Sequence, residues 1–238
     1  MKLLLENWRK YLKEEEEGRK VNIFLDMDGV LVDFPNALKD HIKRVYSLDP
    51  NEAHPNSKSS RKVLSKLQDL GLSDEQVDEL YDAAEEVWVA GGTYKPEEKL
   101  MSRYLLKSLI NNKDLWLSMN KLEGADTLVD KAFELADEVF VLTAQVDDIS
   151  VEAKKEWIAG HFPQINPQNV NVDRDKGGRL RSLIDAGVVA ESDLNILIDD
   201  RQKFLDSFVG AGGIGIQYDF RSPQSAVGEL DRLVGTDL

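Results

Sequence analysis

Two aspartates one residue apart, Asp26 and Asp28, directly follow the apolar segment Val21–Leu25 and precede Gly29. An apolar run that ends in Asp and Gly is typical of a buried strand that stops and turns. This stretch alone leaves two interpretations open. Either the carboxylates cap backbone amides or are solvated at the turn, or they stand at a strand end for catalysis or metal binding.

Polar side chains follow three further apolar segments of the chain. These are Thr143 and Ala144 at the end of Val139–Thr143, Arg174 and Lys176 after Asn169–Val172, and Asp199 and Asp200 after Asn195–Ile198. Because ligands of open parallel sheets bind outside the carboxyl ends of the strands, we expect these side chains to meet. Several carboxylates in one place raise one another's pKa, and a divalent cation with oxygen ligands relieves that repulsion. The sequence therefore predicts a magnesium-dependent phosphate site, with basic groups and a hydroxyl to bind the phosphate.

Short buried strands alternate with amphipathic helices in the second half of the chain. We expect helices over residues 123–137, 151–161 and 178–187, and strands over residues 21–25, 139–143, 169–172, 195–198 and 213–218. This alternation predicts an α/β fold, a Rossmann-like parallel sheet with helices on both faces.

Residues 36–120 show helical periodicity without a convincing strand, and we interpret them as a helical cap inserted after the first strand. The sheet domain would then comprise residues 21–35 and 121–238. Residues 1–20 form a separate amphipathic pattern that ends in a charged run and Gly18, which predicts an N-terminal helix appended to the sheet domain. This helix is a candidate for docking a partner or for homodimer formation.

The composition excludes several classes of function. The 238 residues carry a formal net charge of -14, which disfavours a broad basic face for a nucleic acid polymer. No apolar run is long enough to cross a bilayer, and the first residues do not form a secretory signal. The absence of cysteine excludes disulfides and thiolate metal sites and is consistent with a cytoplasmic protein.

Four short motifs resemble, in order, those of the haloacid dehalogenase-like phosphohydrolase superfamily. They are "DMDGVLVD", "VLTA", a downstream lysine and "LIDDR", and the resemblance covers about residues 21–218. Within the superfamily the chain looks most like the 5'(3')-deoxyribonucleotidases, through "DMDGVLVDF", "LTA…EAKKEW" and "RDK". The resemblance implies a phosphomonoesterase that dephosphorylates (deoxy)nucleoside monophosphates.

The resemblance also implies roles for the acidic residues. Asp26 would be the nucleophile that forms an aspartyl phosphate, and Asp28 the general acid and base. Magnesium would be held by the Asp26 carboxylate, the Asp28 backbone carbonyl and Asp200. Asp199 would act through a water molecule or position Lys176.

Substrate contacts are implied in the same way. Thr143 and the backbone amide of Ala144 would hold phosphate oxygens, assisted by Arg174. Lys176 or Lys154 would supply the lysine of the superfamily. Two aromatic residues would stack on or pack against a base, namely Phe34 and Trp116.

The chain departs from the nucleotidase pattern in places that concern specificity. Ala144 stands where those enzymes have serine, their prolines near the Gly-Ala turn at Gly124 and Ala125 are absent, and a further helix lies between Lys176 and Asp199. Two alternatives therefore stay open. One is the same chemistry on another small phosphomonoester, such as a sugar phosphate, and the other is a non-catalytic binding protein on the same fold. Base, sugar, phosphate position and oligomeric state do not follow from the sequence.

Overall fold

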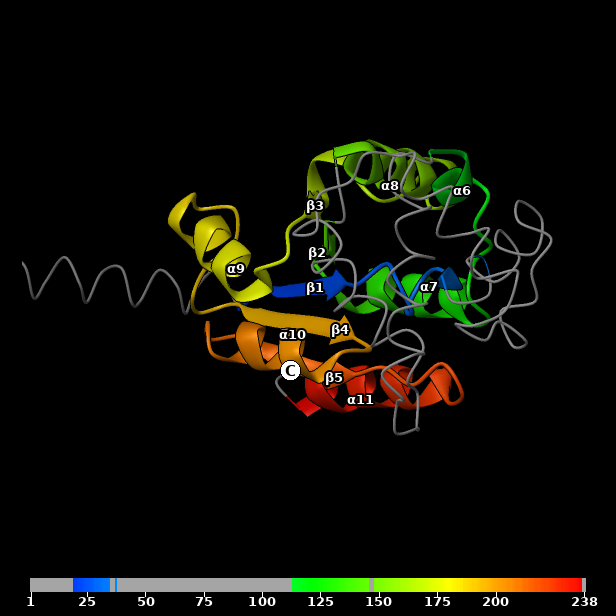
Figure 1. The fold of residues 1–238 in the computed structure, drawn as a ribbon. Helices are drawn as coiled ribbons and strands as arrows, with labels where there is room; N and C mark the ends of the chain where they lie inside the picture. The colour runs from blue at the N-terminus through cyan, green and yellow to red at the C-terminus, as the bar shows by residue number, and fades with distance from the viewer. Residues whose placement is uncertain (1–18, 35–36, 38–112, 146–147, 237–238) are drawn as a thin grey trace, which may run out of the picture. The chain divides into compact units, whose positions relative to one another are not determined.

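The computed structural model describes residues 19–34, 37, 113–145 and 148–236 (Figure 1). The predicted cap over residues 36–120 and the predicted N-terminal helix over residues 1–20 lie almost entirely outside the described residues. Along the described parts of the chain, no helix combines the length and the apolar composition that crossing a membrane requires.

Five parallel strands form one sheet in the order β3-β2-β1-β4-β5. The strands are β1 (Val21–Leu25), β2 (Glu138–Thr143), β3 (Val170–Val172), β4 (Leu194–Asp199) and β5 (Ile214–Gln217). Each lies where the sequence predicted a strand, within two residues at either end. With helices flanking the sheet, the structure confirms the predicted α/β, Rossmann-like fold.

Four helices of the described chain flank the sheet, namely α7 (Ala125–Leu135), α9 (Lys176–Asp185), α10 (Gln202–Val209) and α11 (Pro223–Thr236). A short 3-10 helix, η1 (Pro167–Asn169), precedes β3. Two of the four helices, α9 and α10, share a hydrophobic core with the sheet. Phe24 and Leu197 of the sheet pack with Leu180 of α9 and with Leu205 and Phe208 of α10. Phe24 also stacks on Phe140, with ring centroids 4.6 Å apart. On the described chain, α7 and α11 pack on one another.

The sequence analysis named neither α10 nor α11. The spacing of Phe204, Leu205 and Phe208 carries the helical signal for α10, since all three fall on one side of a helix. This segment has only 8 residues and begins two residues after the aspartate pair at the end of β4, so its helical periodicity is short.

The chain divides into two compact units. The first comprises residues 1–31, 122–144 and 164–238 and contains the sheet, and the second comprises residues 32–121 and 145–163. The sequence analysis placed all of residues 121–238 in the sheet domain, whereas the structure groups α8 (Asp148–His161) with α6 (Lys113–Leu117). The reason is direct packing: Trp157 Nε1 donates to the Met119 carbonyl oxygen over 2.9 Å, and Lys113 pairs with Glu156 at 2.7 Å.

Candidate active site

The register of β1 and β4 brings two aspartates side by side. Leu25 pairs with Ile198, and the amide of Asp26 donates to the Ile198 carbonyl oxygen over 2.9 Å. Asp26 and Asp199 are the next residues along the two strands. Since side chains alternate along a strand, Asp26 lies on the same face as Phe24, and Asp199 on the same face as Leu197. Both carboxylates therefore lie on the face covered by α9 and α10.

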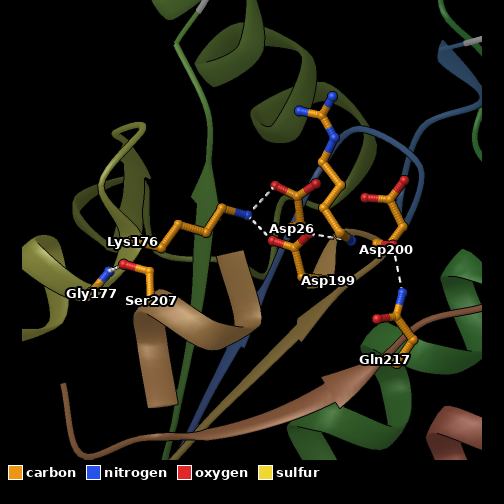
Figure 2. A network of polar contacts seen from close by, with 8 residues as sticks. Asp26, Lys176, Gly177, Asp199, Asp200, Ser207 and Gln217 are labelled. Carbon is orange, nitrogen blue, oxygen red and sulfur yellow. Dashed lines mark hydrogen bonds and ion pairs between the residues drawn. The ribbon is translucent and has the colours of Figure 1, made fainter. Parts of the chain in front are cut away.

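Lys176, the first residue of α9, lies between these two carboxylates (Figure 2). Its Nζ donates to Asp26 Oδ1 over 2.6 Å and also to Asp199 Oδ2. The lysine is fully buried and both aspartates are nearly so. A buried ammonium group is stable only when it is paired and hydrogen-bonded, and this one has two charged partners.

A third carboxylate, Asp200, completes an acidic cluster. One oxygen from each of Asp26, Asp199 and Asp200 lies within 4.8 Å of the others. With all four groups ionised, three negative charges face one positive charge, which leaves two negative charges uncompensated among these residues. This donor set matches a hard divalent cation, which prefers carboxylate oxygens and brings two positive charges.

Desolvation and mutual repulsion act on the pKa values of the cluster. Desolvation and the charge of Asp26 raise the pKa of Asp199 to about 6, although Lys176 opposes the shift. Desolvation and the charges of Asp26 and Asp199 raise the pKa of Asp200 to about 8, even though the residue as a whole is exposed. Desolvation by itself would lower the pKa of Lys176, but the two aspartates more than offset it and raise the pKa. For Asp199 and Asp200, desolvation and mutual repulsion thus outweigh the neighbouring cations Lys176 and Arg201.

Gly29 is required where the chain leaves β1. Its φ is +83°, in the left-handed region that glycine adopts without strain. A Cβ at this position would lie 2.5 Å from Asp200 Oδ2. The absence of a side chain therefore lets the turn approach the Asp200 carboxylate.

The remaining predicted residues of the first unit lie at the carboxyl ends of β2 and β3 or in the turn after β1. Thr143 is fully buried at the end of β2, and its carbonyl oxygen accepts a 2.8 Å hydrogen bond from the Asp173 amide. Ala144 is half-buried and Arg174 is exposed. Asp28 is half-buried in the turn that follows β1.

Three predicted residues belong to the second unit and form a cluster there. The rings of Phe34 and Trp116 stack with centroids 5.4 Å apart, and Lys154 Nζ lies 5.0 Å from the Trp116 ring centroid. Lys154 is fully buried, and Trp116 is 1% exposed. The predicted site residues thus fall into two groups, and it is Lys176 that contacts Asp26.

Sequence reasoning missed the residues that support the site from α10 and β5. Ser207 accepts a hydrogen bond from the Gly177 amide, and Gln217 Nε2 donates to the Asp200 carbonyl oxygen (Figure 2). Phe204 lies with its ring centroid 4.8 Å from Lys176 Nζ. A polar residue at the end of the last strand was the available signal for Gln217, whereas the role of Ser207 has no local signature.

Comparison with known proteins supports the fold. No protein-family model matches the chain, and no curated protein matches it. Among solved structures, a "putative phosphoglycolate phosphatase" from Lactobacillus delbrueckii subsp. bulgaricus is similar, at 12% identity and a TM-score of 0.51, covering 91% of this chain and 99% of that one. The "putative HAD-hydrolase YfnB" from Bacillus subtilis, bound to magnesium, is similar at 13% identity and a TM-score of 0.51, covering 91% of this chain and 99% of that one.

A haloacid dehalogenase-like family hydrolase from Xanthomonas campestris matches with a TM-score of 0.49 and 15% identity, over 93% of this chain and 97% of that one. At these identities the similarity concerns the fold and not the substrate. The chain has the α/β fold of haloacid dehalogenase-like hydrolases, and an acidic cluster that could bind a metal lies at the carboxyl ends of its central strands.

Proposed function

We propose that the chain is a magnesium-dependent phosphomonoesterase that acts through an aspartyl phosphate on Asp26, with (deoxy)nucleoside monophosphates as substrates. One observation carries the proposal. A buried aspartate at the end of the central strand is bonded to a buried lysine and lies within 4.8 Å of two further carboxylates. An aspartate placed only to cap a turn needs neither a buried cation nor two acidic neighbours.

The first step uses Asp26 as nucleophile. A carboxylate oxygen of Asp26 attacks phosphorus, and the bond from phosphorus to the leaving oxygen breaks. Lys176 holds Asp26 Oδ1, so the carboxylate is oriented before the substrate arrives. Asp28 donates its proton to the leaving alkoxide, which departs as an alcohol.

The second step restores the enzyme. Water attacks the phosphorus of the aspartyl phosphate, and Asp28, now a carboxylate, takes up the proton. The bond between phosphorus and the Asp26 oxygen breaks, which releases inorganic phosphate. Dividing one displacement into two lets a single acid-base residue serve both.

Asp26 and Asp200, with the Asp28 carbonyl, would hold the magnesium ion, and Asp199 holds Lys176. The bound ion would neutralise charge on the phosphoryl group. The fit rests on three carboxylates of which two share one lysine, and on desolvation, which together with the neighbouring carboxylates raises the pKa of Asp199 and Asp200.

The phosphate would contact Thr143, the Ala144 amide and Arg174, which lie at the same edge of the sheet as Asp26. The nucleotide specificity rests on the resemblance of the sequence motifs to those of the 5'(3')-deoxyribonucleotidases.

A second candidate is a small phosphomonoester without a base, such as a sugar phosphate. The observation in its favour is the packing of the aromatic pair. Trp116 is 1% exposed and Phe34 is 8% exposed, so the two rings pack against each other and offer no open face for stacking.

The test is phosphate release from a panel of nucleoside monophosphates and sugar phosphates, with magnesium or with a chelator. Asp26→Asn keeps the shape of the side chain and removes the nucleophile. Asp130→Asn, on the exposed side of α7, is the matched control. We expect release that requires magnesium, vanishes in Asp26→Asn and persists in Asp130→Asn.

Release from deoxynucleotides supports the nucleotide assignment, and release from sugar phosphates alone supports the second candidate. If no phosphomonoester is hydrolysed, the enzyme assignment fails and a binding role on this fold takes its place. The N-terminal segment would then be the first part of the chain to test for a partner.

A further inference from the structure

Helix α10 presents two side chains to the start of α9, namely Phe204 and Ser207. They are three residues apart and so lie on one side of the helix. Ser207 Oγ accepts a hydrogen bond from the Gly177 amide over 3.2 Å (Figure 2). It also donates to Asp175 Oδ1 over 3.2 Å. The hydroxyl therefore binds the residues immediately before and after Lys176.

The first turn of α9 is fixed by further contacts. Asp175 caps the helix, because its Oδ1 accepts a 2.9 Å hydrogen bond from the Gly178 amide. The Gly178 bond and the Ser207 hydroxyl lower the pKa of Asp175, which keeps the cap ionised. Gly177 has no side chain where α10 approaches: a Cβ there would lie 2.2 Å from the Ser207 carbonyl oxygen.

The other end of the lysine meets α10 as well. Lys176 Nζ lies 4.8 Å from the centroid of the half-buried Phe204 ring, a distance at which a cation is attracted to the ring. The same ammonium group donates to Asp26 and Asp199. Helix α10 thus contacts the two chain neighbours of Lys176, Asp175 and Gly177, through Ser207, and the charge of Lys176 through Phe204.

We infer that Ser207 and Phe204 are positioning residues for Lys176, and through it for Asp26, in a reaction that neither of them touches. This inference rests on the proposed function. A lysine side chain has many rotamers, so the charge at its end is placed accurately only when the stem is anchored as well. The Ser207 hydroxyl anchors the backbone from which the stem starts, and the Phe204 ring flanks the charge.

The experiment compares Ser207→Ala with Ser182→Ala in steady-state hydrolysis of the best substrate of the panel. Ser182 is an exposed residue of α9 whose hydroxyl donates to the Gly178 carbonyl oxygen, so Ser182→Ala is the same change of side chain in the helix that carries Lys176. For Ser207→Ala we expect kcat to fall about tenfold, with KM within about twofold, because the misplaced lysine affects the transition state more than substrate binding. Ser182→Ala should match the wild type, and Ser207→Thr, which retains the hydroxyl, should recover most of kcat.

Amide exchange at Gly177, followed by NMR, reports the anchor without turnover. It should accelerate in Ser207→Ala, where the acceptor of that amide is lost, and remain unchanged in Ser182→Ala. Phe204→Leu provides a second variant, for which we expect a lower kcat with normal exchange at Gly177.

The outcomes separate this inference from the proposed function. Wild-type protein that hydrolyses no phosphomonoester overturns both. Active wild-type protein with an unchanged kcat in Ser207→Ala, despite faster exchange at Gly177, overturns the positioning role alone and leaves Ser207 as a structural contact. A fall in kcat that Ser207→Thr does not recover also overturns it.

Discussion

The two ends of β1 and β4 carry buried polar groups of opposite character. At the amino end, Asn22 Nδ2 donates to Asn195 Oδ1 over 3.0 Å and to Asp193 Oδ2 over 3.1 Å. Asn195 Nδ2 donates in turn to the Ala190 carbonyl oxygen, and the Ala190 amide donates to Asp193. At the carboxyl end of the same strands, the Lys176 ammonium group donates to Asp26 and Asp199, and a third carboxylate, Asp200, has an oxygen within 4.8 Å of theirs.

The amino-end groups form a network of satisfied hydrogen bonds, whereas the carboxyl-end groups form a cluster of carboxylates that repel one another. The amino-end network consists of amides and one carboxylate whose donors and acceptors match, so it is satisfied by the fold itself. In the carboxyl-end cluster, desolvation and the charges of neighbouring carboxylates raise the pKa of Asp199 and Asp200, so the ionised forms of these groups are destabilised. The burial of polar groups alone therefore does not indicate a functional site. Buried carboxylates with a raised pKa are the additional signal that supports the proposed function.

The largest effect is expected from Lys176→Met, which removes the cation that pairs with both Asp26 and Asp199. Leaving buried carboxylates without their partner costs about 3–5 kcal/mol of unfolding free energy, and hydrolysis should be lost. Urea denaturation and a phosphate-release assay measure the two effects. Lys155→Met, at an exposed lysine of α8, should change neither. Retained activity in Lys176→Met would remove this residue from the mechanism.

Asn22→Ala tests the other end of the strands. The substitution leaves Asn195 Oδ1 without its Asn22 donor and removes one of the two hydrogen bonds that Asp193 Oδ2 accepts, and we expect about 1–3 kcal/mol of destabilisation. Because this network lies at the opposite ends of β1 and β4, kcat and KM should remain at wild-type values at a temperature where the variant is folded. A lower kcat in the folded variant would show that the two ends of the sheet are coupled.

Gly29→Ala should separate stability from activity at the carboxyl end. The positive φ makes the alanine cost about 1–2 kcal/mol, and the new Cβ must displace the Asp200 carboxylate. We expect the apparent affinity for magnesium in the hydrolysis assay to weaken, and the variant to need more magnesium for half-maximal rate. An unchanged magnesium requirement would exclude Asp200 as a ligand.

The smallest effect concerns pH. In metal-free protein, the folded-state pKa values of Asp199, about 6, and Asp200, about 8, lie above their ordinary value of 3.8. The folded chain then binds more protons than the unfolded chain between about pH 4 and pH 8, so its stability falls as pH rises through this window. Solvent screening limits the contribution of the exposed Asp200. The melting temperature in chelator should decrease from pH 5 to pH 8, and less so in Asp200→Asn.

Magnesium should reverse that trend, because it competes with protons for the same oxygens. The measurement is a pair of melting series across the same pH values, with the ion and with chelator. Parallel series would contradict magnesium binding at the acidic cluster.

Much of the first unit could be predicted from local sequence. A continuous apolar run such as Val21–Leu25 indicates a strand covered on both faces, and the polar residue at its end indicates what that strand presents to a ligand. This reasoning predicts, without the strand order, that Asp26, Asp199, Asp200 and Lys176 lie together, as they do in the structure. Residues far apart in the chain meet here because parallel strands align their carboxyl ends.

The supporting contacts could not be predicted in this way. The hydrogen bond between Ser207 and Gly177 joins residues 30 positions apart on two helices, and nothing in either segment specifies how those helices pack. The same holds for α8, whose amphipathic pattern is compatible with packing on the sheet. Its partner α6 is set by tertiary contacts such as that of Trp157 with Met119.

The pairing of β1 with β4 also determines when during folding the acidic cluster and Lys176 can come together. The paired residues Asn22 and Asn195 are 173 positions apart, and Lys176 is 150 positions from Asp26. Contacts between such distant residues form slowly, because a long loop must close before they contribute any stability. Partly folded chains with β4 undocked therefore lack the cluster altogether. If the proposed function holds, activity would return during refolding only when the sheet is complete, and not when the helices form.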